Sequence, residues 1–240
     1  MSPNISPAGD DALSVIRSLG QQDSALELTK SFRGLVVRQG VTILAVNPDG
    51  VTLRVTDLEM CTALEGDVYL HNQSFPRPVM AHLESMNIHK GEFILSGFTY
   101  KDCEWKKRQH ERVQPRLPTY VTLRWKGVAV RACLANISAN GVGILAYKLI
   151  ERGIALQPGA NIHLDFQLSP DHKYTALKGT ITHLNSTGNL ATVGIRLFPK
   201  AKEAQQLERY VAHRKQEILE ELSLAYWEKS KPRGVDSLYF

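Results

Sequence analysis

The sequence has little cysteine and no long apolar run, and these two features argue against a disulfide-rich protein and against a membrane-spanning one. Its three cysteines, Cys61, Cys103 and Cys133, stand far apart and never in a CxxC pair, so neither a disulfide framework nor a cysteine zinc site is expected. No stretch approaches the roughly 18 uninterrupted apolar residues of a membrane helix. The first residues lack a basic segment followed by an apolar block, so no secretory signal is expected. These features predict a cytoplasmic protein without a membrane span.

Catalytic motifs are also missing. The eight histidines have no metal-ligand spacing such as HxxxH, and the chain has no GxSxG, P-loop or GxGxxG. The adjacent acidic pairs Asp10-Asp11 and Glu220-Glu221 lie in a polar arm and on a predicted helix, where solvation is their expected role. The sequence therefore predicts a protein that is not an enzyme and has no metal or cofactor.

Charge is divided unevenly along the chain. Residues 1–100 contain 7 Lys and Arg against 11 Asp and Glu, whereas residues 101–240 contain 22 against 13. A division of this kind favours two units, the second of which meets an anionic partner. An ordinary solvated surface explains the same numbers, so charge alone does not decide between the two interpretations.

The first half of the chain has the pattern of short β-strands. Residues 1–22 are rich in Ser, Pro, Gly, Asp and Gln, which predicts a flexible arm with at most one short helix. Alternating apolar runs broken by turn residues follow, and the strongest turn signal is the sequence VNPDGV at residues 46–51. Five or six strands at this spacing predict an N-terminal β-barrel regulatory domain over residues 23–105.

The second half begins with a break in this pattern. Residues 106–118 are charged and contain two prolines, which indicates a linker between domains. A second series of strands predicts another small antiparallel barrel over residues 119–200. A helix is expected over residues 201–230, before a tail at 231–240, because its apolar residues recur every three or four positions. The fold class is therefore mainly β, with two barrels in tandem and a C-terminal helix.

The face of this helix has two interpretations. It carries Leu207, Val211, Arg214, Ile218 and Leu222. It packs on a barrel in the first interpretation, and it binds a partner or a second copy of the chain, as a homodimer, in the other.

The linker contains three arginines at intervals of four residues: Arg108, Arg112 and Arg116. Pro115 and Pro118 argue against a helix over its second half, because proline removes a donor and restricts the residue before it. The arginines are therefore expected in an extended segment. The planar guanidinium fork matches phosphate oxygens and stacks on flat rings, so these residues are candidates for binding an anionic ligand.

A second polar cluster, the sequence NISANG at residues 136–141, lies between two predicted strands. Asn and Ser hydrogen-bond local backbone and Gly tolerates positive φ, so a tight turn or bulge explains the cluster by itself. Its position gives it further weight. It follows the RxxxR motif by about 20 residues and lies on the predicted barrel.

Together the two motifs resemble the PilZ domain, the bacterial receptor module for cyclic di-GMP, whose signature is RxxxR followed by [D/N]xSxxG. Here they read Arg112-Val-Gln-Pro-Arg116 and Asn136-Ile-Ser138-Ala-Asn-Gly141. The resemblance covers about residues 106 to 200 and includes VGIRLF at residues 193–198, which is similar to the family's closing strand. It implies that cyclic di-GMP lies against the barrel at the second motif, with the linker arginines folded over it.

The resemblance also implies a role for each motif residue. Arg112 and Arg116 would clamp phosphate and the O6/N7 edge of guanine. Asn136 and Ser138 would offer short polar groups to a guanine edge, and Gly141 would let the backbone approach the ligand closely.

Arg108 is a further candidate, since Arg108-Gln-His-Glu-Arg112 is also an RxxxR. It is either a third contact or a surface charge.

The two-barrel layout looks like that of YcgR-type receptors. That likeness implies that the ligand changes the relative placement of the two domains and so regulates a protein partner, such as the flagellar motor or the secretion or polysaccharide machinery.

A small β-barrel module that binds nucleic acid or protein, without cyclic di-GMP, is the alternative function. The basic second half and the aromatic residues Trp105, Tyr120 and Trp125 near arginines suit a single-strand binder. These aromatic residues are few and not clustered, so nucleic acid is not the expected partner. Whether one cyclic di-GMP or a stacked pair would bind is left open by the sequence.

Overall fold

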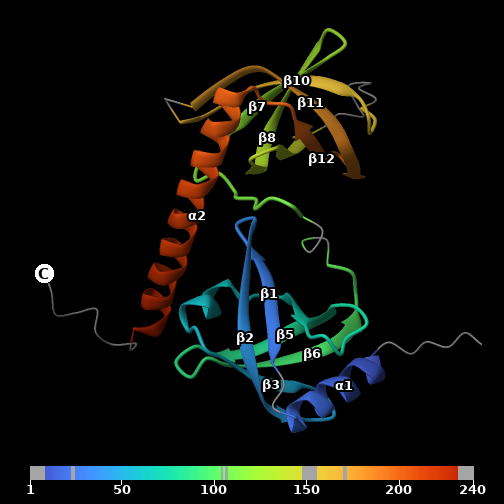
Figure 1. Ribbon diagram of the computed structural model, residues 1–240, viewed down its shortest axis with the longest axis vertical. Coiled ribbons are helices and arrows are strands. Elements are labelled where there is room, and N and C mark those ends of the chain that lie inside the picture. Colours follow the sequence, from blue (N-terminus) through green and yellow to red (C-terminus); the bar gives the residue numbers. More distant parts are fainter. Residues whose placement is uncertain are drawn as a thin grey trace, which may run out of the picture. The chain divides into compact units, whose positions relative to one another are not determined.

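The computed structural model describes residues 9–22, 25–103, 105, 108–147, 156–169 and 172–231 (Figure 1). Contacts between residues divide the chain into two compact units. The first comprises Met1–Phe32, Val36–Arg108 and Leu219–Phe240, and the second comprises Arg33–Leu35 and Gln109–Ile218. Each unit is built on one barrel.

The first barrel is closed by six antiparallel strands in the order β1-β2-β3-β6-β5-β4. Alternation of buried and exposed residues explains these strands: in β3, Val51, Leu53 and Val55 face the core whereas Arg54 faces solvent. The strands are β1 (Leu26–Phe32), β2 (Leu35–Val46), β3 (Val51–Val55), β4 (Asp67–His71), β5 (Val79–Asn87) and β6 (Glu92–Tyr100).

Helix α1 (Gly9–Gln21) packs on the core of this barrel. Its residues Ala12, Ile16 and Leu19 are buried, at the three- and four-residue spacing of one helical face. The prediction for residues 1–22 allowed at most one short helix, and α1 is a helix of that kind. Its packing on the barrel was not predicted, because a short amphipathic helix is marginal by itself and gains its stability from the core that it covers. Residues 1–8 lie outside the described part of the chain.

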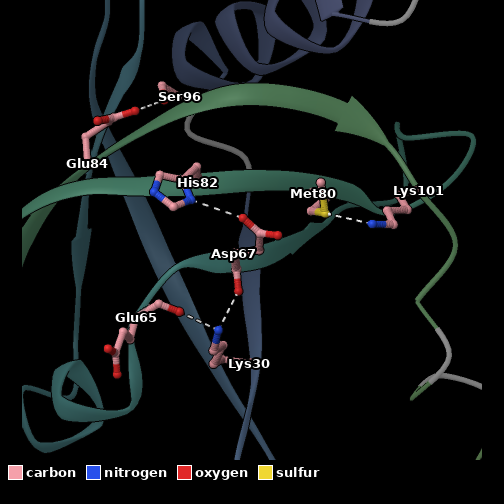
Figure 2. Close-up of polar contacts among 8 residues, drawn as sticks. All are labelled: Lys30, Glu65, Asp67, Met80, His82, Glu84, Ser96 and Lys101. Carbon is pink, nitrogen blue, oxygen red and sulfur yellow. Dashed lines mark hydrogen bonds and ion pairs between the residues drawn. The ribbon is translucent and has the colours of Figure 1, made fainter. Parts of the chain in front are cut away.

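Polar contacts cross the outer surface of the first barrel between neighbouring strands (Figure 2). The Lys30 ammonium donates to the carbonyl oxygen of Asp67 at 2.7 Å and also to that of Glu65. Partial burial of this ammonium lowers the pKa of Lys30. His82 Nδ1 lies 3.1 Å from Asp67 Oδ1. These contacts belong to the first unit and stabilise the pairing of β4 with its neighbours.

The second barrel is also closed by six antiparallel strands, in the order β10-β11-β12-β9-β8-β7. The strands are β7 (Tyr120–Trp125), β8 (Val128–Ser138), β9 (Gly141–Tyr147), β10 (Asn161–Ser169), β11 (His172–Thr187) and β12 (Leu190–Leu197). The predicted fold class, two tandem barrels with a C-terminal helix, is confirmed. The helix is α2 (Ala201–Ser230).

Helix α2 buries its apolar face within the chain. Leu207, Val211 and Ile218 are buried in the second unit, and Leu222 packs with Val37 and Ala63 in the first unit, next to the short helix η1 (Glu59–Ala63). Within the described residues, no helix combines the length and the apolar character that crossing a bilayer requires.

Candidate functional site

One backbone pairing brings the two sequence motifs together. The N–H of Val113 in the linker donates to the carbonyl of Ile137 in β8, and the N–H of Ile137 donates to the carbonyl of Val113, both at 2.9 Å. Both side chains are fully buried. Arg112 directly precedes Val113 and Ser138 directly follows Ile137, so this bridge brings the arginine motif to the end of β8 that carries the second motif. The linker therefore pairs with β8 past the beginning of β7, whose first residue, Tyr120, pairs with Cys133.

The second motif forms the hairpin between β8 and β9 (Figure 1). Strand β8 ends at Ser138 and β9 begins at Gly141, which pairs with it. The buried Ser138 hydroxyl donates to the Gly141 carbonyl at 3.1 Å. A register shift between Leu134 and Asn136 places a bulge just before the motif. The predicted turn and bulge are thus both present, and Ser138 closes the turn.

Gly141 is required for a different reason from the one expected of a turn. It does not belong to the glycines with positive φ. A Cβ at this position would lie only 3.0 Å from the carbonyl oxygen of Ile195 in β12. The turn therefore does not use the tolerance of glycine for positive φ at this position, and Gly141 serves the close approach of two strands.

Asn136 holds a buried oxygen without a partner. No atom of the described residues hydrogen-bonds its Oδ1. Its amide lies over Gly143, where a Cβ would come within 2.7 Å of Nδ2 and 2.9 Å of Oδ1. Since a buried unsatisfied acceptor costs about 1–3 kcal/mol, this oxygen is suited to accept a hydrogen bond from a ligand.

Residues in the first half of α2 form hydrogen bonds with the linker. The guanidinium of Arg214, only 1% exposed, donates from Nε to the carbonyl of Gln114 at 2.9 Å. The Tyr210 hydroxyl hydrogen-bonds the main chain of Arg116, and burial raises the pKa of Tyr210. Lys215 Nζ donates to Glu111 Oε1 at 2.7 Å. The linker backbone is thus held between β8 and a helix about 100 residues away in sequence.

Arg116 is tied to the same helix by its side chain. Its Nη1 lies 3.5 Å from Glu217 Oε1, while 72% of the side chain remains exposed. Glu217 also accepts from Arg214 Nη1 at 3.0 Å. The carboxylate of Glu217 therefore connects the buried arginine of the helix to the second arginine of the linker motif.

The outer face of the barrel next to the hairpin carries two rows of residues across β8, β9, β12 and β11. The residues between them, such as Val142 and Ile195, point into the core, so these rows point outward. The row that we call the glycine row consists of Asn136, Gly143, Gly194 and His183. The adjacent row, the serine row, consists of Ser138, Gly141, Arg196 and Thr180.

Several residues of this surface were missed in the sequence. Arg196 is exposed and lies directly opposite Gly141. It belongs to the VGIRLF stretch, so its strand was recognised but its outward position beside the second motif was not. Arg214 was counted on an apolar helix face, and an arginine at such a position was the available signal of a buried polar contact.

Arg108 and the surface described above belong to different units. It belongs to the first unit, where its N–H donates to the carbonyl of Trp105 at 3.1 Å. Its role as a third ligand contact therefore stays a prediction. In the described ranges, no group of three or more His, Cys, Asp or Glu is arranged to hold a metal ion.

Comparison with known proteins finds a family match in the second half of the chain. The family model described as "PilZ domain" matches residues 106–213, which confirms the resemblance found in the sequence. An uncharacterised protein of Aquifex aeolicus is 28% identical over 156 residues, which cover 64% of this chain and 71% of that protein.

Two solved structures are similar over most of the chain. YcgR of Escherichia coli, in complex with c-di-GMP, is 17% identical with a TM-score of 0.44, over 91% of this chain and 93% of YcgR. The MrkH–c-di-GMP complex of K. pneumonia is 12% identical with a TM-score of 0.48, over 89% of this chain and 97% of MrkH.

Proposed function

We propose that this chain, which carries a PilZ domain at residues 106–213, is a receptor for cyclic di-GMP without catalytic activity. The observation that carries the proposal is the backbone pairing of Val113 with Ile137. It aligns the arginine motif with the NxSxxG motif on one face of the second barrel. A dianion with two guanine bases would then meet arginine from the linker and polar groups from β8.

The proposed contacts follow from the chemistry of each group. Arg112 and Arg116 donate bidentately to phosphate or to guanine O6 and N7. Asn136 Oδ1 accepts from the N–H groups of a guanine edge, which satisfies its buried oxygen. The Ser138 hydroxyl already donates to Gly141, so toward the ligand it acts as an acceptor. Gly141 leaves the surface beside it free of a side chain.

The proposed output is a change in how the two domains are placed. The linker joins the two barrels in sequence, and ligand contacts to its arginines would favour one arrangement over others. Such a shift requires only that the ligand binds one arrangement more tightly. A protein partner, such as the flagellar motor or the secretion or polysaccharide machinery, would recognise the favoured arrangement in the cytoplasm.

Isothermal titration calorimetry of the full chain with cyclic di-GMP tests the proposal, with GTP and GMP as control ligands. Selective binding at micromolar concentration or tighter is the expected result, and the stoichiometry separates one nucleotide from a stacked pair. The nucleic-acid module would instead be supported by two results together. The chain would bind a single-stranded oligonucleotide with an affinity that falls steeply and log-linearly as salt is added, and it would not bind cyclic di-GMP.

A further inference from the structure

His183 holds an unusual position on the outer face of the second barrel. Its imidazole lies directly over Gly194 of the neighbouring strand, since a Cβ at Gly194 would come within 1.9 Å of His183 Cε1 and 2.2 Å of Nδ1. The residue itself is exposed. The Cε1 and Nδ1 atoms of the ring therefore cover the glycine, while the residue as a whole is accessible to solvent.

The backbone around His183 supports this placement. A register shift between Ile181 and His183 leaves Thr182 as an extra residue in β11. The Thr182 hydroxyl donates to the Gly194 carbonyl at 3.0 Å, and it lies 3.4 Å from His183 Nδ1. The bulge thus keeps the ring in register with Gly194 although the strands shift there.

The other end of the glycine row has the same construction. The Asn136 amide lies over Gly143 as the His183 ring lies over Gly194, and the two glycines are paired in adjacent strands. Two planar side chains therefore lie over two paired glycines. The row crosses three strand intervals, which corresponds to roughly 14 Å between its end residues. Arg196 of the serine row lies in the same strand as Gly194, two residues further on.

We propose that His183 is a binding residue of the cyclic di-GMP site, whose imidazole stacks on a guanine base at the end of the glycine row opposite Asn136. The inference rests on the proposed function and extends it, because the two sequence motifs supply polar groups for one guanine and the phosphates. A second base needs a flat apolar surface. Base stacking on an aromatic ring contributes about 1–3 kcal/mol, or roughly 5- to 150-fold in affinity.

The chain offers a direct test of stacking against other roles. His183→Ala removes the ring, and His183→Phe keeps a flat ring without its nitrogen atoms. Calorimetric titration with cyclic di-GMP is expected to show a loss of about tenfold or more for His183→Ala and nearly full affinity for His183→Phe. His163→Ala is the matched control, since His163 is an exposed histidine on β10 of the same barrel.

Gly194→Ala provides a second route to the same site. Its methyl group would occupy the position of the ring, so the imidazole must move away while the strand remains. The loss of affinity is expected to match that of His183→Ala, and the double variant is expected to lose no more than either single variant. Thermal unfolding of each variant checks that the barrel is intact.

The outcomes separate the two levels of the proposal. No binding of cyclic di-GMP by the unmodified chain would overturn the proposed function, and this inference with it. Binding by the unmodified chain with equal affinity for His183→Ala would overturn only the role of His183. A loss in His183→Phe as large as in His183→Ala would also overturn stacking, since it would assign the contact to the ring nitrogens.

Discussion

The buried guanidinium of Arg214 in α2 donates to the main-chain carbonyl of Gln114, which lies between the two arginines of the RxxxR motif. It also donates to the Glu217 carboxylate. Both contacts are charge-assisted, and burial of the guanidinium makes them difficult to replace. The C-terminal helix therefore holds the arginine linker by a buried hydrogen bond, in addition to packing its own apolar face.

Substitution of this arginine should destabilise the second unit. We expect Arg214→Ala to lower the free energy of unfolding by about 2 kcal/mol or more. The substitution removes the donor to the main-chain carbonyl of Gln114 and creates a cavity. Arg214→Lys should recover only part of this loss, since an ammonium lacks the planar fork. Urea denaturation measures the effect, with the exposed Arg209→Ala on the same helix as control. Equal stability of the two alanine variants would contradict the structural role of Arg214.

The linker arginines should be essential for ligand binding. Arg112→Ala and Arg116→Ala are each expected to weaken cyclic di-GMP binding on the order of a hundredfold, because each removes a bidentate charged contact. Thermal unfolding should change little for Arg116→Ala, whose side chain is largely exposed. Calorimetry checks both, with Arg131→Ala as an exposed arginine elsewhere on the barrel. Unchanged affinity in Arg116→Ala would show that the site is assigned incorrectly.

The ion pair between Arg116 and Glu217 should oppose ligand binding. The Glu217 carboxylate occupies the guanidinium that phosphate would need, so Glu217→Gln is expected to tighten cyclic di-GMP binding about two- to fivefold. The same variant should lower stability, because Arg214 loses an ionised partner. Titrations at low salt give the largest difference. Glu208→Gln, an exposed residue of the same helix, should change neither quantity, and weaker binding of Glu217→Gln would argue that Glu217 orients Arg116 for the ligand.

Asn136 should affect binding and stability in opposite directions. Asn136→Ala removes a buried acceptor that has no partner, so the unfolding free energy should stay the same or rise by about 1 kcal/mol. Binding of cyclic di-GMP should be lost, because the acceptor for the guanine edge is gone. Urea denaturation and calorimetry on the same preparation measure both. A large loss of stability would mean that the amide is satisfied by water and has a structural role.

Stability should fall at alkaline pH through Tyr174. Burial raises the pKa of Tyr174 to about 12, above the ordinary value of 10.0. Because the folded state binds this proton more tightly, its contribution is complete below pH 10 and is lost as pH rises toward 12. Tyr174→Phe should reduce the slope of stability against pH in this window. It should also remove a buried hydroxyl that lacks a hydrogen-bond partner among the described residues. An unchanged slope would exclude Tyr174 as the titrating group.

The fold class could be predicted from the sequence because its signals are local. Alternation of apolar residues and clusters of turn residues act over a few positions, and they indicated both barrels and the helix at Ala201–Ser230. The sequence allowed one short helix in the N-terminal segment, but the packing of α1 on the barrel core through Ile16 depends on contacts that only the tertiary structure provides.

The proposed binding surface shows the same division between local and tertiary information. The two motifs could be found in the sequence because residue type and spacing alone define them, and the family match at residues 106–213 confirms their context. Their alignment through Val113 and Ile137, the buried contact from Arg214 and the position of His183 over Gly194 join segments far apart in the chain. Strand register and helix docking decide these contacts, and both depend on how the whole barrel closes. The sequence by itself thus determined which chemical groups are present, and the tertiary structure decided which of them share a surface.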